Sequence, residues 1–300
     1  MIAKLMMNTA VLDHVVWNWK GQAVRVGVDR LGTGPTVLLL PALSSISTRC
    51  EMRPLQERLA PNFTAVAVDW PCFGDEPRPA IRWEPDAYVA FLRYILTEVV
   101  TQPFATVAAG HAASYALAVG AETASSTGRL CLIAPTWRGP LPTMMGGRRN
   151  LGRWIVRLGD LPTLGQLLYR LNVNAPVISM MARGHVYVDP NWLKGERFDQ
   201  KLAVAQATGA RHTSIRFVTG MLDLMTSRSD FLEVARRFTE PILIVYGAAT
   251  PKRSKAEMNA LAVLPNVRAV ELRRGKLGLH EEFTNEVAEV VKSFLEGRVR

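Results

Sequence analysis

The stretch of residues 105–119 constrains this 300-residue chain more than any other. Residues 105–109 form an apolar run, Gly110 follows, and small residues at helical spacing begin a few positions later. A strand, one sharp turn and a helix are the setting in which a Gly-x-Ser-x-Gly motif lifts a serine nucleophile above a sheet. Here Gly110 and His111 are followed by Ala112, so a methyl group stands where the nucleophile is expected.

Strand patterns alternate with helical patterns along most of the chain, which indicates βαβ units and a mostly parallel sheet. The runs that predict strands are residues 15–19, 23–28, 36–40, 64–68, 105–109, 129–133, 242–246 and 267–272. From Thr136 to Arg237 the pattern is helical and broken by glycine and proline. We therefore predict an α/β core of residues 1–135 and 238–300, with a mostly helical cap and return segment at 136–237.

Composition and residue spacing limit the kinds of partner that we expect this protein to bind. The formal net charge is +10, which favours an anionic surface or ligand. The three cysteines have no metal-ligand spacing, and the glycines of residues 32–34 precede a strand rather than a helix, the wrong order for a phosphate-binding loop. We expect no metal, no cofactor and no nucleic acid. The N-terminus has no secretory pattern, so we expect a cytoplasmic protein.

Several weak features occur in a consistent order along the chain. They are Trp17–Gly21, Gly32–Pro35, Asp69 with the Phe73-Gly74-Asp75 segment, the turn at Gly110, residues 241–247 and the His280-Glu281-Glu282-Phe283 segment. In this order they make the chain resemble the α/β-hydrolase-fold superfamily. It is similar in particular to a subgroup that has Gly-His-Ala-Ala in place of Gly-x-Ser-x-Gly and a Pro-Lys-Arg-Ser-Lys-Ala-Glu-Met segment, here 251–258. The resemblance implies an eight-stranded, mostly parallel sheet flanked by helices, with a helical cap.

The resemblance also implies where a Ser, acid and His triad would stand. The nucleophile position is Ala112, and the acid position, three residues past Gly247, is Thr250. The histidine position is Leu277, with His280 three residues further on. A methyl group cannot attack a carbonyl, and a hydroxyl cannot stabilise an imidazolium as a carboxylate does. The chain would be classed as a hydrolase by fold, without a conventional triad.

Other side chains near these positions leave alternatives open. Ser114 is either a small packing residue or a rival nucleophile, and His111 either packs or activates a water molecule. His280 either packs at the start of the last helix or turns into the cleft. The residues expected to line a ligand pocket are Leu43, Ser44, His111, Ala112, Ala113, Trp137 and His185.

Three functions are compatible with these positions. The first is a protein that binds a small apolar ligand under the cap without triad hydrolysis. The second is an atypical enzyme on the same fold, an esterase-type hydrolase, a lyase or a cofactor-free oxygenase, that uses His111 or His280 with water. The third is a scaffold that binds a protein partner.

The cap contains a helical pattern with two different faces. Leu151, Trp154, Ile155 and Leu158 recur at one helical spacing, and Arg149, Arg153 and Arg157 at another. Residues 148–158 therefore predict either a helix that lies on an anionic membrane surface, which would make the protein peripheral to a membrane, or a lid helix that packs over the pocket.

Overall fold

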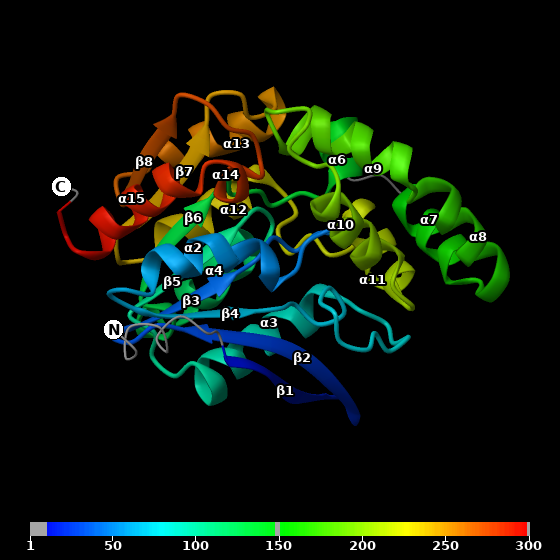
Figure 1. Ribbon diagram of the computed structural model, residues 1–300, viewed down its shortest axis with the longest axis horizontal. Coiled ribbons are helices and arrows are strands. Elements are labelled where there is room, and N and C mark those ends of the chain that lie inside the picture. The colour runs from blue at the N-terminus through cyan, green and yellow to red at the C-terminus, as the bar shows by residue number, and fades with distance from the viewer. Residues whose placement is uncertain (1–10, 148–150, 299–300) are drawn as a thin grey trace.

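The computed structural model describes residues 11–147 and 151–298, and its centre is one eight-stranded sheet (Figure 1). The strands are β1 Val11–Trp19, β2 Gln22–Leu31, β3 Thr36–Leu40, β4 Thr64–Val68, β5 Ala105–Ala109, β6 Arg129–Ile133, β7 Ile242–Gly247 and β8 Val267–Leu272. Their order is β1-β2-β4-β3-β5-β6-β7-β8. The β1–β2 and β2–β4 pairs are antiparallel and the others are parallel. The predicted eight-stranded, mostly parallel sheet is confirmed.

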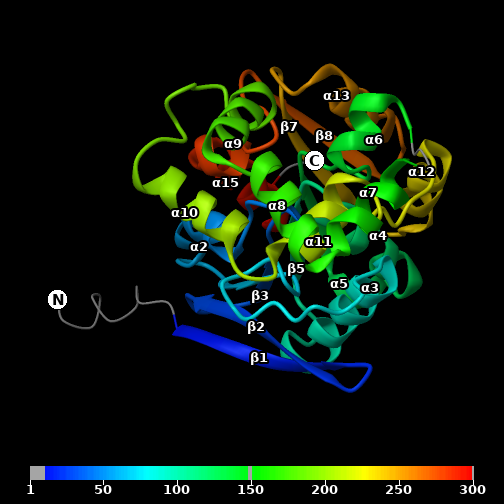
Figure 2. The same cartoon turned by 90° about the vertical axis from the view of Figure 1, so that its right-hand side faces the viewer.

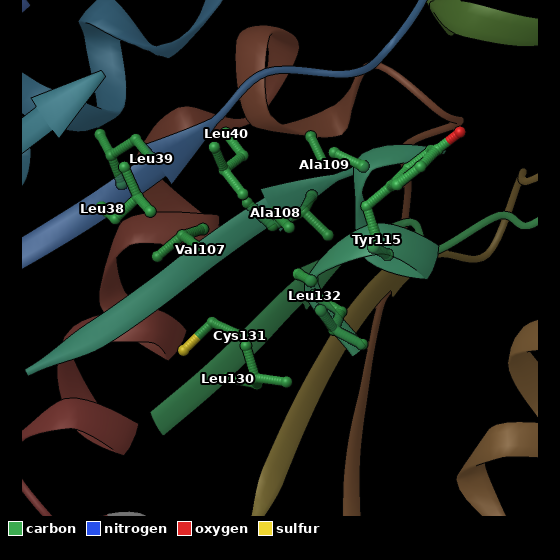
Figure 3. Packing of buried hydrophobic residues seen from close by; sticks show 14 of the residues in the cluster. Leu38, Leu39, Leu40, Val107, Ala108, Ala109, Tyr115, Leu130, Cys131 and Leu132 are labelled. Carbon is green, nitrogen blue, oxygen red and sulfur yellow. The ribbon is translucent and has the colours of Figure 1, made fainter. Parts of the chain in front are cut away.

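The central strands are buried on both faces, which explains their uninterrupted apolar sequences. All five residues of β5 are buried, as are the last four of β3 and of β6 (Figure 3). Neighbouring strands pair in register, with Leu39 beside Val107 and Val107 beside Cys131. This rigid centre ends at the turn after β5, where the predicted nucleophile position lies.

Helices connect the strands and cover the sheet. They are α2 Arg53–Leu59, α3 Pro85–Tyr94, α4 Ala112–Glu122, α5 Ala124–Thr127, α6 Pro140–Met145, α7 Leu151–Asp160, α8 Pro162–Asn172, α9 Ala175–Met181, α10 Glu196–Gln206, α11 Ala210–Val218, α12 Arg228–Arg237, α13 Lys252–Ala262, α14 Leu279–Glu282 and α15 Thr284–Leu295. Three shorter turns are η2 Arg49–Met52, η3 Ile95–Val99 and η4 Ala182–Val186. α15 packs on α2, whereas α4 packs between α3 and α12.

The loop after β3 is anchored by a buried arginine. The Arg49 guanidinium contacts Asp29 at 2.7 Å, Asp69 at 2.5 Å and Asp75 at 2.6 Å. Gly27 leaves the necessary space, because a Cβ there would lie 2.2 Å from Arg49 Nη1. Burial raises the pKa of Asp69 to about 6, although Arg49 acts against this shift. The cluster fixes η2, which contains Glu51, the centre of the charged cluster described below.

The helices α6 to α11 form an insertion between β6 and β7, which we call the helical insertion (residues 140–218; Figure 2). It has a small apolar cluster of its own, built around Ile178, Tyr187 and Leu193, against which Ile46 of the core packs. α12 lies after the insertion in sequence and packs on α4 and α13 of the core. Within residues 11–147 and 151–298, no helix is both long and apolar enough to span a membrane.

Candidate functional site

The turn after β5 has its apex at Gly110. This residue has a φ of +52°, in the left-handed region that disfavours side chains. His111 has helical backbone angles, and Ala112 is already the first residue of α4. The nucleophile of such a turn occupies the strained apex between strand and helix. The residue with the left-handed backbone is therefore Gly110, two residues before the predicted Ala112, and it carries no side chain at all.

The surroundings of Gly110 agree with this register. A Cβ built on Gly110 would point at the loop after β3 and lie 3.2 Å from the Cβ of Ala42. Gly110 and Ala42 are both partly exposed, whereas Ala112 has no exposed surface. The accessible space at the turn thus adjoins Gly110 and Ala42.

Most of the predicted pocket residues are buried. Leu43 and Ala113 have no exposed surface, and the Ala113 N–H donates a hydrogen bond to Gly110 O at 3.3 Å. The Trp137 indole N–H donates to Glu257 at 3.1 Å. Ser44 and His185 are half-buried, and the Ser44 hydroxyl shares a hydrogen bond with Ser47 at 3.0 Å.

His111 points toward the segment that returns from the helical insertion. Its Nε2 lies 3.2 Å from Leu222 O and 3.6 Å from Asp223 Oδ1. The Tyr115 hydroxyl donates to the same Leu222 carbonyl at 2.6 Å, and the ring of His111 meets Phe217 edge to face. Because His111 is 2% exposed, these contacts tie the turn to the insertion and leave the imidazole away from solvent.

The Ser114 and Thr250 hydroxyls and the Cys72 thiol are buried as well. Ser114 has no exposed surface, and its Oγ donates to His111 O at 2.9 Å, which is the contact of a packing residue. Burial raises the pKa of the Cys72 thiol to about 12, so its reactive thiolate is disfavoured at neutral pH. Thr250 follows β7 at the acid position and is 4% exposed. Its Oγ1 has no hydrogen-bond partner among the described residues.

The loop after β8 is tied to the helical insertion rather than directed at Gly110. The Leu277 N–H donates to His185 O at 3.3 Å, and the Gly278 N–H donates to Val186 O at 2.9 Å. His280 lies on α14, is 2% exposed, and places its Nε2 3.3 Å from Glu51 Oε1. The imidazole is therefore paired with a core carboxylate at the start of the closing helices.

Glu51 is the centre of a buried charged cluster. Its Oε1 accepts a hydrogen bond from Ala42 N–H at 2.7 Å, and its Oε2 lies 3.4 Å from Lys201 Nζ. The same ammonium lies 2.9 Å from Glu281, which also accepts a 2.6 Å hydrogen bond from the Tyr187 hydroxyl. Burial opposes ionisation of Glu51, but Lys201 and His280 outweigh it and lower the pKa of Glu51 to about 2.

This charged cluster tests the expectation that the chain holds no metal. Glu51, His280 and Glu281 place potential ligand atoms within 4.8 Å of one another, which suits a divalent cation in spacing. Lys201 already places a positive charge between the two carboxylates. Sequence reasoning missed Glu51 and Lys201, because 150 positions separate them and neither belongs to a motif.

The fold is an eight-stranded, mostly parallel sheet flanked by helices, with Gly110 at the turn after β5 and Thr250 in the loop after β7. Comparison with known proteins agrees on the scaffold. The profile of the alpha/beta hydrolase family matches residues 37–290, so the chain belongs to that family. A search of curated proteins finds no match to this sequence.

Solved structures with a similar fold include several hydrolases. A hydrolase from Pseudomonas aeruginosa aligns with a TM-score of 0.72 at 14% identity, over 96% of this chain and 99% of that one. An esterase from Thermogutta terrifontis aligns with a TM-score of 0.73 at 14% identity, over 96% and 99%. A haloalkane dehalogenase from Agrobacterium tumefaciens aligns with a TM-score of 0.70 at 12% identity, over 95% and 96%. At these identities the likeness concerns the fold alone.

Proposed function

We propose that this protein is a non-hydrolytic member of its family, which binds a small apolar ligand at the turn after β5 instead of cleaving it. The observation that carries this proposal is the apex itself, since Gly110 offers neither a hydroxyl nor a thiol. The side chains at the expected acid and base positions, Thr250 and Leu277, supply neither a carboxylate nor an imidazole. Triad residues act as a unit, so their joint absence removes the covalent route to hydrolysis.

The backbone of the turn supports binding even without a nucleophile. In such folds, the N–H of the residue after the nucleophile and an N–H of the loop after β3 point at a substrate carbonyl. His111 and Leu43 occupy these positions, and Glu51 holds the loop through Ala42 N–H at 2.7 Å. Donors of this kind orient and polarise a carbonyl, but do not cleave its ester bond unaided.

The chemistry of the accessible space favours an apolar ligand. It adjoins Gly110 and the methyl group of Ala42, which are both partly exposed. The carboxylate that accepts a hydrogen bond from the Ala42 N–H, Glu51, is already paired with Lys201 and also contacts His280. The imidazole of His111 is directed at Leu222 and Asp223, which favours binding over an imidazole-driven reaction.

The proposal is tested by two measurements on the purified protein. A panel of activated esters with a fluorophosphonate probe should give neither turnover nor labelling. Native mass spectrometry, followed by organic extraction, should find a small apolar molecule bound. Ala42→Leu, which fills the space opposite Gly110, should lose that molecule, whereas Val263→Leu on the exposed surface should keep it. Labelling of any side chain in step with turnover would refute the non-hydrolytic assignment, and equal retention by Ala42→Leu would refute the location.

A further inference from the structure

Helices α7 and α8 expose an apolar surface at the far end of the helical insertion. We call it the apolar crest, and its members are Trp154, Leu158, Leu161, Leu164, Leu167 and Leu171. Trp154 and Leu171 are each 61% exposed, and Leu164, the least exposed of the three crest leucines on α8, is still 45% exposed. The sequence left open whether the stripe of α7 packs over a pocket, and the structure turns Trp154 and Leu158 outward.

The crest is continuous across the two helices. Trp154 and Leu158 are four residues apart on α7, and Leu164, Leu167 and Leu171 are spaced by three and four on α8, so each set shares one helical face; Leu161 lies in the turn between the two helices. α7 and α8 pack on each other and stand apart from the sheet, at the right of Figure 1 and facing the viewer in Figure 2. A contiguous exposed apolar patch of this kind marks a docking surface.

Positive charge accompanies the crest. Arg153 and Arg157 on α7 and Arg170 on α8 are exposed, and the Arg157 guanidinium lies 5.1 Å from the centre of the Trp154 ring. The acidic residue of α7, Asp160, is held by Arg216 at 2.7 Å. The crest therefore presents leucines and a tryptophan beside arginines.

A cleft of about 640 Å³ lies on the other side of α7. Its charged and titratable lining residues are Arg82, Glu84, Arg153, Arg157, Asp160, Arg211, His212 and Arg216. Five arginines and two acids thus line the cleft; Glu84 is paired with Arg82 and Asp160 with Arg216, each at 2.7 Å, so the arginines exceed the acids by three. Guanidinium groups in this number suit phosphate oxygens, which accept two parallel hydrogen bonds from each.

We propose that the apolar crest and the arginine-lined cleft form one docking site for the surface of an anionic phospholipid bilayer. The leucines and Trp154 enter the boundary between head groups and acyl chains, while the arginines contact phosphates. The charge of the site selects this occupant over a second copy of the chain, because a symmetric pair would bring the same arginines against each other. The net charge of +10 also attracts the protein to an anionic bilayer, over a longer distance than the contacts of single arginines.

The experiment measures co-sedimentation of the full chain with vesicles. Vesicles of phosphatidylcholine with phosphatidylglycerol should retain the protein, vesicles of phosphatidylcholine alone should retain little, and added salt should weaken the retention. The Arg153→Gln/Arg157→Gln variant should bind the anionic vesicles about 30-fold more weakly, since each basic residue near such a surface contributes ~1 kcal/mol. Leu167→Asn/Leu171→Asn should weaken binding to a similar extent through the apolar contact.

Matched controls separate the site from general charge and hydrophobicity. Arg236→Gln/Arg237→Gln on α12 removes the same charge from an exposed helix, and Val263→Asn removes an exposed apolar side chain; neither should reduce binding more than about twofold. Equal loss in the control and crest variants, or equal binding to neutral vesicles, would overturn the proposal. So would a dimer in analytical ultracentrifugation that the crest variants dissociate. Either result leaves the ligand at Gly110 untouched, because that proposal depends on other residues and another assay.

Discussion

Lys201 is the residue whose removal should most clearly report how the helical insertion is held to the core. Its ammonium reaches from α10 to two core carboxylates, Glu281 at 2.9 Å and Glu51 at 3.4 Å. The Glu51 side chain is 2% exposed, and that of Lys201 is 12% exposed. Lys201→Met keeps the length and apolar stem of the side chain but leaves a buried carboxylate without its main cation.

The expected cost follows from burial. Breaking a buried ion pair by removing one partner typically costs ~3–5 kcal/mol. At about 2 °C per kcal/mol for a chain of this size, the midpoint of thermal unfolding should fall by about 6–10 °C. His280, 3.3 Å from Glu51, remains as a second partner and keeps the cost toward the lower end.

The pH dependence gives an independent check. The pKa of Glu51 is lowered from its ordinary value of 4.5 to about 2, so the folded state gains stability above pH 4.5 that is lost as the pH falls toward 2. A shift of that size corresponds to about 3 kcal/mol. Without Lys201 the pKa of Glu51 rises and this contribution shrinks. The difference in unfolding free energy between wild type and Lys201→Met should therefore be largest at pH 7 and become smaller toward pH 3.

Urea unfolding followed by circular dichroism at pH 7 and pH 3.5 measures both effects. The matched control is Lys255→Met, because Lys255 pairs with Glu271 at 2.8 Å but the two side chains are 25% and 40% exposed. The Lys255→Met substitution should lower the free energy of unfolding by less than ~1 kcal/mol at either pH. The reasoning is refuted if Lys201→Met costs no more than Lys255→Met at pH 7, or if its gap to wild type widens in acid.

Four further substitutions test the roles of other residues. Gly27→Ala places a Cβ 2.2 Å from Arg49 Nη1 and should destabilise the chain by ~3 kcal/mol or more in chemical unfolding; an unchanged midpoint would contradict the anchoring role of Arg49. Gly110→Ser and Ala112→Ser should each leave fluorophosphonate labelling at background, because a new hydroxyl still lacks an acid and a base; labelling of either would show that a working base is in reach. Thr250→Val removes a buried hydroxyl without a partner among the described residues and should raise stability by up to ~1 kcal/mol; a loss of stability would reveal a hydrogen bond there.

The strands could be predicted because their signal is local. Residues 36–40, 64–68, 129–133 and 267–272 were expected as strands, and the structure has strands at the same bounds. The first three of these strands are buried along most of their length on both faces, which needs a short, continuous apolar run, whereas β8 is partly exposed.

The site was less predictable because it depends on single dihedral angles and on distant contacts. The motif pattern Gly-His-Ala-Ala placed the apex at Ala112, but only the φ of Gly110 shows which residue turns the chain. The pairing of Glu51 with Lys201 joins two segments that carry no shared pattern. The stripe on α7 was visible in the sequence, yet periodicity does not tell whether an apolar face meets a core or solvent.

Glycine at the apex has a consequence for the energy of the folded state as well as for reactivity. In a family member with a nucleophile at this turn, a residue with a side chain held at a φ near +52° raises the free energy of the folded state by about 1 kcal/mol, which other interactions in the fold must offset. Gly110 adopts the same angle with little strain. Because this chain lacks that backbone strain, its folded state can accommodate an unfavourable feature elsewhere, such as the exposed leucines and tryptophan of the apolar crest.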